Sequence, residues 1–452
     1  MSAIFNRAAD SYRDIFRASD ITTDAMKAAV EDWYRLYYQE GPTEKEDPCQ
    51  RIPSTIVRKL TKTAFSEYTA TSKDEFARSI LNALDKKRNS AMQKSLIGGL
   101  CMIKPVPGKA GFRFTLVDRG NILVFGRNSE GEPVDIGTAE TTIRDQYYYT
   151  LLERRTVDAN GYLTIRNYLC QSTTQGTIGQ QVRLGALTEY AALPEEYTFQ
   201  VPIGSVGLAP LKTPMENCVD GSPDNVSVYA AATGLIHNIN ANEAQLNGEF
   251  ERGESRVIVS DDMLKRDKGG KKVFREHIFS GLNDDPETVG VTIFSPALRE
   301  ASFLARKTEY LRNVENVIGL KRGLLSEVEA AERTAKEITS SEGDYALTIK
   351  DFQVAWETAA REVLRLCGIL GQLYRVPGAH EIAEDAVSFS FGNGVLYDEE
   401  KTGKELLAQV QAGLLQPERY LGWYYDLPCD TEAQRAKIRK DYMPEVLEDG
   451  DE

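Results

Sequence analysis

The chain has 452 residues, a mass of 50.4 kDa and a net charge of −14 at pH 7. Its apolar fraction of 41% is enough to form buried cores, which excludes a wholly disordered chain. A protein that coats nucleic acid by neutralising phosphates should be basic, so the acidic balance argues against that class. No stretch approaches the roughly 18 consecutive apolar residues of a membrane span, and the opening residues lack the apolar core of a signal peptide, so we expect neither.

Cysteine and histidine usage gives no sign of a metal site or a disulfide framework. The six cysteines are scattered without a C-x-x-C pair, which favours reduced thiols in a protein made in the cytoplasm. His237, His277 and His380 lack the H-E-x-x-H spacing of a zinc site. The nearest approach to a phosphate-binding loop, at Gly403-Lys404, has Glu405 where Ser or Thr is needed. We therefore expect no cofactor and no enzymatic activity.

Helical periodicity dominates the first hundred residues. Apolar side chains recur at intervals of three and four from Ala25 to Tyr38 and predict an amphipathic helix there. Pro53 is placed to begin a second helix, since proline is favoured in a first turn. Ser72 and Glu75 have the spacing of a capping box and predict the start of a third helix at Thr71-Ser72.

Residues 100–210 have short β-rich runs separated by turn residues. The predicted strands are Phe112–Val117, Ile122–Phe125, Tyr147–Leu152, Tyr162–Leu169 and Tyr197–Val201. Turn residues such as Pro107-Gly108 and Asn160-Gly161 lie between them. The pattern predicts an antiparallel region of hairpins with edges to which a partner subunit could pair.

Two long helices are predicted on either side of a compact insert. The first runs from Asp224 to about Phe250, and the second follows Pro296 as far as Val317. The insert, residues 254–295, has strands at Arg256–Ser260 and Thr288–Phe294. Two long helices joined at one end by a small α/β cap bury little of their own surface, so we expect them to need neighbours.

The last third of the chain is predicted to be mainly helical. A helix at Glu327–Ile338 is followed by a polar loop at Thr339–Asp344 and a long helix from about Thr348 to Leu373. A short strand, Val387–Phe391, precedes three helices at Asp398–Leu414, Pro417–Tyr424 and Thr431–Asp441. The fold class expected from these elements is α+β. Residues 441–452 form an acidic tail.

A basic turn lies within the insert. Six cationic side chains fall within eleven residues: Lys265, Arg266, Lys268, Lys271, Lys272 and Arg275. One interpretation is a solvated hairpin tip, in which Gly269-Gly270 supply the turn. The other is a docking surface for an acidic partner or DNA.

Four short elements carry a family resemblance. In chain order they are P-L-x-x-P-x-x-N (Pro210 to Asn217), S-V-Y (Ser227 to Tyr229), E-F-x-x-G-x-x-R-I/V (Glu249 to Val257) and T-A-x-E-I (Thr334 to Ile338). With these elements in this order, the chain resembles the portal proteins of tailed double-stranded DNA bacteriophages, in the siphophage branch. The resemblance covers roughly residues 50 to 440 and departs at Asn238-Ile239-Asn240, where an Asp is expected.

The resemblance implies a ring, usually of twelve copies, at one capsid vertex of the virion. DNA, bound without sequence specificity, enters and leaves through the ring. The implied partners are the terminase large subunit, a head–tail adaptor, and the major capsid and scaffolding proteins. The implied regions are a wing (1–223), stem helices (224–253 and 296–320), a clip (254–295), a tunnel loop with a long wing helix (321–394) and a crown (395–440).

The resemblance also implies site residues. The DNA-facing tunnel loop would comprise Ser340, Ser341, Glu342, Gly343 and Asp344, although this segment also fits an ordinary helix connection. The basic turn would dock the terminase and the adaptor. Arg299, Arg306 and Lys307 could place cations along the channel, or could form solvated or intersubunit ion pairs. An acidic channel wall would repel DNA and let it slide.

Two other classes of function compete. A packaging enzyme such as a terminase or nuclease would need a phosphate loop or clustered acids. Another structural head protein, such as a head-morphogenesis component or a major capsid subunit, is the other alternative. A major capsid protein would assemble into shells, whereas a portal forms isolated rings.

Overall fold

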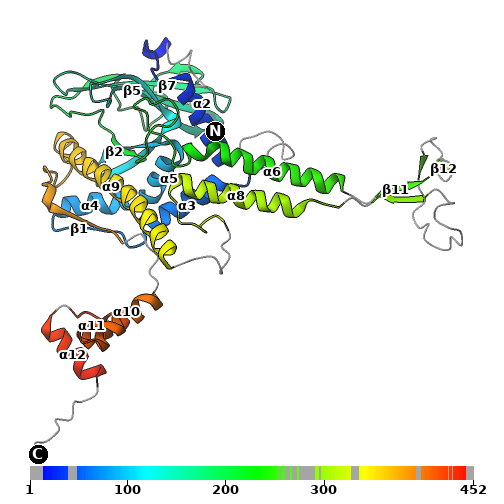
Figure 1. The fold of residues 1–452 in the computed structure, drawn as a ribbon. Coiled ribbons are helices and arrows are strands. Elements are labelled where there is room, and N and C mark those ends of the chain that lie inside the picture. Colours follow the sequence, from blue (N-terminus) through cyan, green and yellow to red (C-terminus); the bar gives the residue numbers. More distant parts are fainter. Residues whose placement is uncertain are drawn as a thin grey trace, which may run out of the picture. The chain divides into compact units, whose positions relative to one another are not determined.

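The computed structural model describes residues 14–38, 48–253, 256–259, 265–266, 272–273, 291–294, 297–326, 335–392, 399–425, 427–429 and 431–443. The chain divides into two compact units, Met1–Gly394 and Val395–Glu452. Figure 1 shows helices and sheets together in the first unit and helices in the second. The mixed fold class is confirmed.

Four helices lead into the first unit's sheets. They are α2 (Asp24–Tyr38), α3 (Ile52–Ala64), α4 (Glu75–Asp85) and α5 (Arg88–Gly98). The predicted helices at 25–38 and behind Pro53 are confirmed. The capping box is wrong, because Ser72 ends strand β1 (Thr69–Ser72) and the N-cap of α4 is Asp74, whose carboxylate accepts from the amides of Phe76 and Ala77.

Two antiparallel sheets follow. One has the order β10-β2-β3, with β2 at Leu100–Gly108, β3 at Gly111–Asp118 and β10 at Ala209–Lys212. The other has the order β4-β5-β6-β7-β8, with β4 at Ile122–Arg127, β5 at Pro133–Arg144, β6 at Tyr147–Val157, β7 at Leu163–Ser172 and β8 at Gln180–Val182. Strand β9 (Glu196–Thr198) also pairs with β7. The predicted hairpin region is confirmed, and β2, β5, β8 and β10 are strands that the sequence pattern did not indicate.

The two long helices are α6 (Thr233–Arg252) and α8 (Glu300–Ile318), which Figure 1 shows side by side. The predicted start at Asp224 is wrong, since a short 3-10 turn at Ala230–Ala232 comes first and α6 begins only at Thr233. Val226 and Tyr229 lie in the hydrophobic core of the first unit, and this burial, not membership of α6, accounts for their apolar side chains. Strands β11 (Arg256–Val259) and β14 (Val291–Phe294) pair between the helices, as do β12 (Lys265–Arg266) and β13 (Lys272–Val273).

A single helix of 39 residues, α9 (Ala335–Leu373), replaces the predicted helix–loop–helix. The predicted polar loop is therefore wrong as a loop: Ser340, Ser341, Glu342, Gly343 and Asp344 all lie within α9. The start of the predicted helix, residues 327–334, is outside the described residues. The predicted strand after α9 is confirmed as β15 (Val387–Ser390), which pairs with β1.

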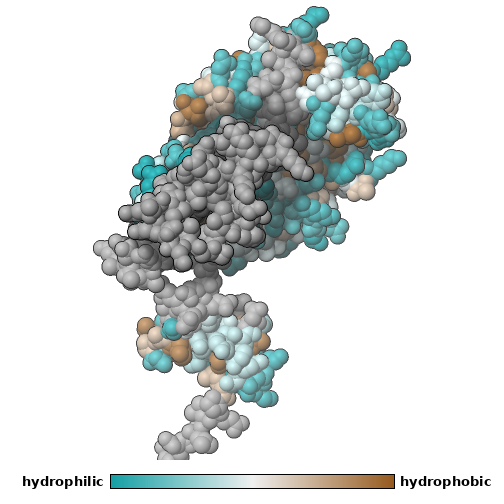
Figure 2. Space-filling view, turned by 90° about the vertical axis from the view of Figure 1, so that its right-hand side faces the viewer, coloured by the Kyte–Doolittle hydropathy of each residue, from teal (hydrophilic) through white to brown (hydrophobic). Residues whose placement is uncertain are grey.

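The main hydrophobic core of the first unit joins helices and sheets, and two smaller clusters lie among the strands of the two sheets. The largest fully buried members of the main core are Trp33, Trp356, Tyr229, Phe352 and Met26. In the second unit, the predicted helices are confirmed as α10 (Glu399–Gln411), α11 (Pro417–Tyr424) and α12 (Glu432–Tyr442). Figure 2 shows apolar residues as separate patches on a mainly hydrophilic surface. None of the described helices has the length and apolar character needed to cross a membrane.

Candidate functional site

The candidate site is the helix pair α6 and α8, whose two helices are joined by ion pairs and hydrogen bonds along their length. Arg299 bonds Glu249 at 2.6 Å, Lys307 bonds Glu243 at 2.9 Å, and Asn242 donates its side-chain amide to the carbonyl oxygen of Phe303 at 3.1 Å. Below these polar contacts lie the buried side chains Ile236, Ile239, Leu246, Val314 and Ile318. These contacts hold the two helices in a defined register.

The motif residues before α6 bind it to the N-terminal helices of the first unit by hydrogen bonds. The hydroxyl of Tyr229 donates to the carbonyl oxygen of Trp33 at 2.9 Å, and Ser227 donates to that of Leu96 at 2.9 Å. The Asn217 side chain closes the preceding turn, accepting from the amide of Val219 at 2.8 Å and donating to Asp220 at 2.8 Å. The S-V-Y and P-L-x-x-P-x-x-N elements are thus structural anchors.

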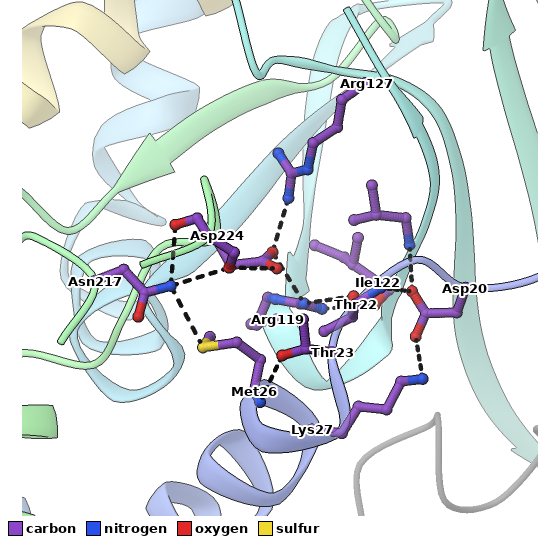
Figure 3. A network of polar contacts seen from close by, with 12 residues as sticks. Asp20, Thr22, Thr23, Met26, Lys27, Arg119, Ile122, Arg127, Asn217 and Asp224 are labelled. Atoms are coloured by element: carbon purple, nitrogen blue, oxygen red, sulfur yellow. Dashed lines mark hydrogen bonds and ion pairs between the residues drawn. The ribbon is translucent and has the colours of Figure 1, made fainter. Parts of the chain in front are cut away.

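A buried charge cluster lies beside this anchor (Figure 3). The carboxylate of Asp224 accepts from Arg127 at 2.8 Å and from Arg119 at 3.3 Å. Arg119 is only 1% exposed and also donates to Thr22 and to the carbonyl oxygen of Ile122. Two cations on one carboxylate tie the segment leading to α6 to strand β4 and to the turn before it.

At the outer end of the pair, where α6 ends and α8 begins, the contacts come from the third motif, Glu249 to Val257. Glu249 accepts from both the backbone amide and the guanidinium of Arg299, so it joins the end of α6 to the start of α8. A Cβ atom at Gly253 would come within 2.4 Å of Leu298. The motif thus places an acid that joins the two helices beside a glycine at which a larger side chain would displace the tip of Leu298.

At the inner end, a buried acid that we did not predict shapes the chain after α8. Glu315 is 1% exposed, and its carboxylate accepts from the amide of Gly323 at 3.1 Å and from the amide and hydroxyl of Ser326 at 2.9 and 2.8 Å. A buried carboxylate is stabilised when backbone donors surround it. Its only sequence signal was an acid on the apolar side of a helix.

The three predicted channel cations have different surroundings. Arg299 and Lys307 are neutralised within the chain by Glu249 and Glu243. Arg306 lies over the ring of Tyr310, with its guanidinium carbon 5.0 Å from the centroid, and donates to the Tyr310 hydroxyl at 2.9 and 3.1 Å. Among the described residues, no acidic group pairs with Arg306.

An open groove of about 430 Å³ runs between the two helices on the side that carries Arg306. Its wall on α6 is uncharged, and its wall on α8 alternates aromatic and cationic side chains. The lining residues are Asn238, Ala241, Asn242, Gln245, Arg299, Ser302, Phe303, Arg306 and Tyr310. The groove therefore offers one guanidinium without an acidic partner between amide and aromatic surfaces.

The other predicted site residues belong to the insert and to α9. Lys265, Arg266 and Lys272 lie in the short strands β12 and β13, whereas Lys268, Lys271 and Arg275 are outside the described residues. In the tunnel segment, Asp344 is exposed. The docking role of the basic turn and the DNA-facing role of residues 340–344 remain predictions.

Two of the three histidines lie within hydrogen-bond distance of a carboxylate, and the third, His277, is outside the described residues. His237 on α6 lies 2.7 Å from Asp32 on α2. Burial acts to raise the pKa of Asp32, but its bonds with His237 and Arg35 outweigh burial and hold that pKa below its usual value. Within the described part of the chain, no group of three His, Cys, Asp or Glu side chains could hold a metal ion.

No protein-family model matches the chain, and no curated protein matches it. A similar solved structure is the neck of an empty GTA particle computed with C6 symmetry, with 10% identity, 88% of this chain and 93% of that chain covered, and a TM-score of 0.43. Another is the neck of a native GTA particle computed with C12 symmetry, with 11% identity, coverage of 85% and 92%, and a TM-score of 0.38. The likeness at these scores is coarse.

Proposed function

We propose that this chain is the subunit of a portal ring of a tailed double-stranded DNA phage, of siphophage type. The ring, of twelve copies, would occupy one capsid vertex of the virion and act as a non-enzymatic channel for DNA packaging and ejection. The basic turn would dock the terminase large subunit and later the head–tail adaptor. Major capsid and scaffolding proteins would surround the ring, after synthesis in the host cytoplasm.

The observation that carries the proposal is the position of the motif residues. Three of the four elements through which the sequence resembles portal proteins hold α6 and α8: Asn217, Ser227 and Tyr229 anchor the start of the pair, and Glu249 and Gly253 lie where its two helices meet. The fourth element, Thr334 to Ile338, falls at the start of α9, and Thr334 is outside the described residues. The first three elements lie before, within and after α6 in the sequence, and the support for the proposal is that their side chains make the contacts that fix the helix pair.

Incomplete burial of the helix pair also supports a ring. Phe250, Leu298 and Leu304 are 45%, 41% and 47% exposed in the single chain. Leu347 and Val354, seven residues apart on α9, are 63% and 54% exposed. Exposed aliphatic side chains on long helices gain burial when copies of one chain surround a common axis.

Electron microscopy of the purified full chain tests the proposal. We expect isolated rings in end-on views, and a particle mass close to twelve times 50.4 kDa. If the helix pair mediates assembly, Leu304→Ser should lower the fraction of protein in rings. Replacing the exposed Glu189 by another polar residue is the control and should leave that fraction unchanged. A chain that stays monomeric at micromolar concentration, or closes into shells, would overturn the proposal.

A further inference from the structure

We infer that the groove between α6 and α8 receives Glu300 and Leu304 of a second copy of this chain. This inference rests on the proposed ring and assigns the contact between neighbouring helix pairs. The inferred contact joins two surfaces of the helix pair. One is the groove, and the other is the side of α8 with Glu300 and Leu304, which would enter the groove of the next copy.

The groove is prepared for a carboxylate. Arg306 is held in place by Tyr310, through two hydrogen bonds and stacking, and has no acidic partner among the described residues. Arg299 lines the same groove but already bonds Glu249. A guanidinium bound to a tyrosine hydroxyl keeps other N–H donors available. Arg306 can therefore donate to one carboxylate without breaking an existing ion pair.

The opposite side of α8 carries the complementary groups. Glu300 and Leu304 are one turn apart, are both exposed, and do not line the groove. At about 100° per residue, Glu300 lies about 120° and Leu304 about 160° around the helix from Arg306. Glu300, too, has no ion pair in the described part of the chain. Within the described residues, one side therefore offers a cation without an acidic partner beside aromatic rings, and the other offers an acid without a basic partner beside an exposed leucine.

A surface with different groups on its two sides fits a head-to-tail contact. In such a contact, the groove side of each copy meets the Glu300 side of the next copy. The copies form a closed ring when the rotation that relates neighbouring copies divides a full turn. Glu300 of one copy would bond Arg306 of its neighbour, and Leu304 would pack on Phe303. Both helices of every pair would then lose exposed apolar surface.

DNA is a less suitable occupant of the groove. A phosphodiester backbone is bound by rows of cations, because each neutralised phosphate releases counterions. The groove has a single guanidinium without an acidic partner, since Glu249 neutralises Arg299, and its α6 wall, from Asn238 to Gln245, is uncharged. A single carboxylate with an aliphatic neighbour matches this set better than a phosphate chain.

A charge-reversal cycle on the full chain tests the contact. Arg306→Glu and Glu300→Arg should each lower the fraction of protein in rings about tenfold at a fixed concentration, because each places like charges together. The double variant should restore that fraction to within about twofold of the unchanged protein. Arg306→Glu combined with Glu189→Arg is the matched control and should not restore rings, because the exposed Glu189 lies outside both α6 and α8.

The outcomes separate this inference from the proposed function. If the unchanged protein forms no rings, the proposed function fails. If rings form and both single reversals leave them intact, the groove contact is overturned while the portal proposal stands. If Arg306→Glu leaves rings intact but weakens binding of a short DNA duplex, the groove binds phosphate, and the inference is again overturned. Circular dichroism spectra of each variant distinguish loss of assembly from loss of folding.

Discussion

At the scale of single residues, Asp224 is the acidic centre of the segment that leads into α6. It is 9% exposed and is paired with Arg119 and Arg127. Arg119 is more deeply buried still, so without Asp224 its charge would remain in the core with weaker compensation. Removing one partner of a buried ion pair costs more than the pair contributes, because the remaining charge keeps its desolvation penalty.

Asp224→Ala should therefore lower the free energy of unfolding by about 3 kcal/mol or more. Urea denaturation followed by circular dichroism measures this change. Glu189→Ala, at an exposed acid without a partner in the described part of the chain, is the control and should change stability by less than about 0.5 kcal/mol. Equal midpoints for Asp224→Ala and the unchanged protein would contradict the assignment of Asp224 as an anchor.

A second residue-scale prediction concerns pH. Both ring nitrogens of His380 face acceptors: Nδ1 lies 2.8 Å from the carbonyl oxygen of Gly378, and Nε2 lies 2.7 Å from the carboxylate of Asp74. Only the protonated imidazole can donate to both, so the Gly378 carbonyl and the Asp74 carboxylate raise the pKa of His380 above its usual 6.5. Burial by itself would raise the pKa of Asp74, but its bond with His380 and two backbone amides lower it.

The stabilisation by His380 is therefore complete below about pH 6.5 and is lost as the pH rises through the raised folded-state pKa. The contribution of Asp74 is lost only as the pH falls below its usual 3.8. His380→Gln should lower the thermal unfolding midpoint more at about pH 5.5 than at about pH 8.5. A difference in midpoint that is the same at both pH values would show that the pair adds no protonation-linked stability.

At the scale of secondary-structure elements, the continuity of α9 changes how residues 340–344 can act. A loop could change conformation around DNA, whereas a helix presents its side chains at fixed positions. Helix propensity gives a direct test, since glycine in a helix interior is about 1 kcal/mol less favourable than alanine. Gly343→Ala should therefore raise the free energy of unfolding by up to about 1 kcal/mol, and Gly343→Pro should lower it by about 3 kcal/mol. Chemical denaturation of the two variants measures both changes.

Destabilisation by Gly343→Ala would indicate that Gly343 needs a backbone conformation other than helical. That outcome would restore the loop interpretation of residues 340–344. The matched control is Ser341→Ala, which keeps the helix and changes no glycine.

Elements with clear periodicity could be predicted from the sequence, and elements that combine two signals could not. Helix α2 has a clean amphipathic pattern, and the strands next to Asn160-Gly161 have an unambiguous turn. The start of α6 was misplaced because Val226 and Tyr229 continue its spacing, although they are buried for another reason. The polar run in α9 by itself predicts a loop, although the helical spacing of Tyr345, Ile349 and Phe352 begins directly after it.

The candidate site was only partly visible in the sequence. Glu249 and Arg299 are 50 residues apart, and only the folded helix pair shows that they bond. The same applies to Asp224 and its two arginines, because no local pattern marks a side chain that will be buried by distant segments. Arg306 was identified as a cation, but its lack of an acidic partner depends on the positions of Glu243 and Glu249.

At the scale of the whole molecule, the net charge of −14 sets how a ring would interact with DNA. Twelve copies at −14 each would carry −168. Of the three predicted channel cations, Arg299 and Lys307 are neutralised by acids of the same chain, and Arg306 would meet Glu300 of the next copy in the inferred contact. A channel of this kind would repel the phosphate backbone and allow it to slide.

Purified rings should therefore bind a short DNA duplex weakly, even at about 50 mM salt, and the logarithm of the affinity should change little with the logarithm of the salt concentration. Fluorescence anisotropy of a labelled duplex measures both quantities. Glu249→Gln, which removes the carboxylate charge that neutralises Arg299 in every subunit, should strengthen binding and steepen the salt dependence, since the ring would gain unneutralised cations. Tight binding by the unchanged ring with a steep salt dependence would mean that the channel grips DNA, and the sliding mechanism would be wrong even if the ring itself forms.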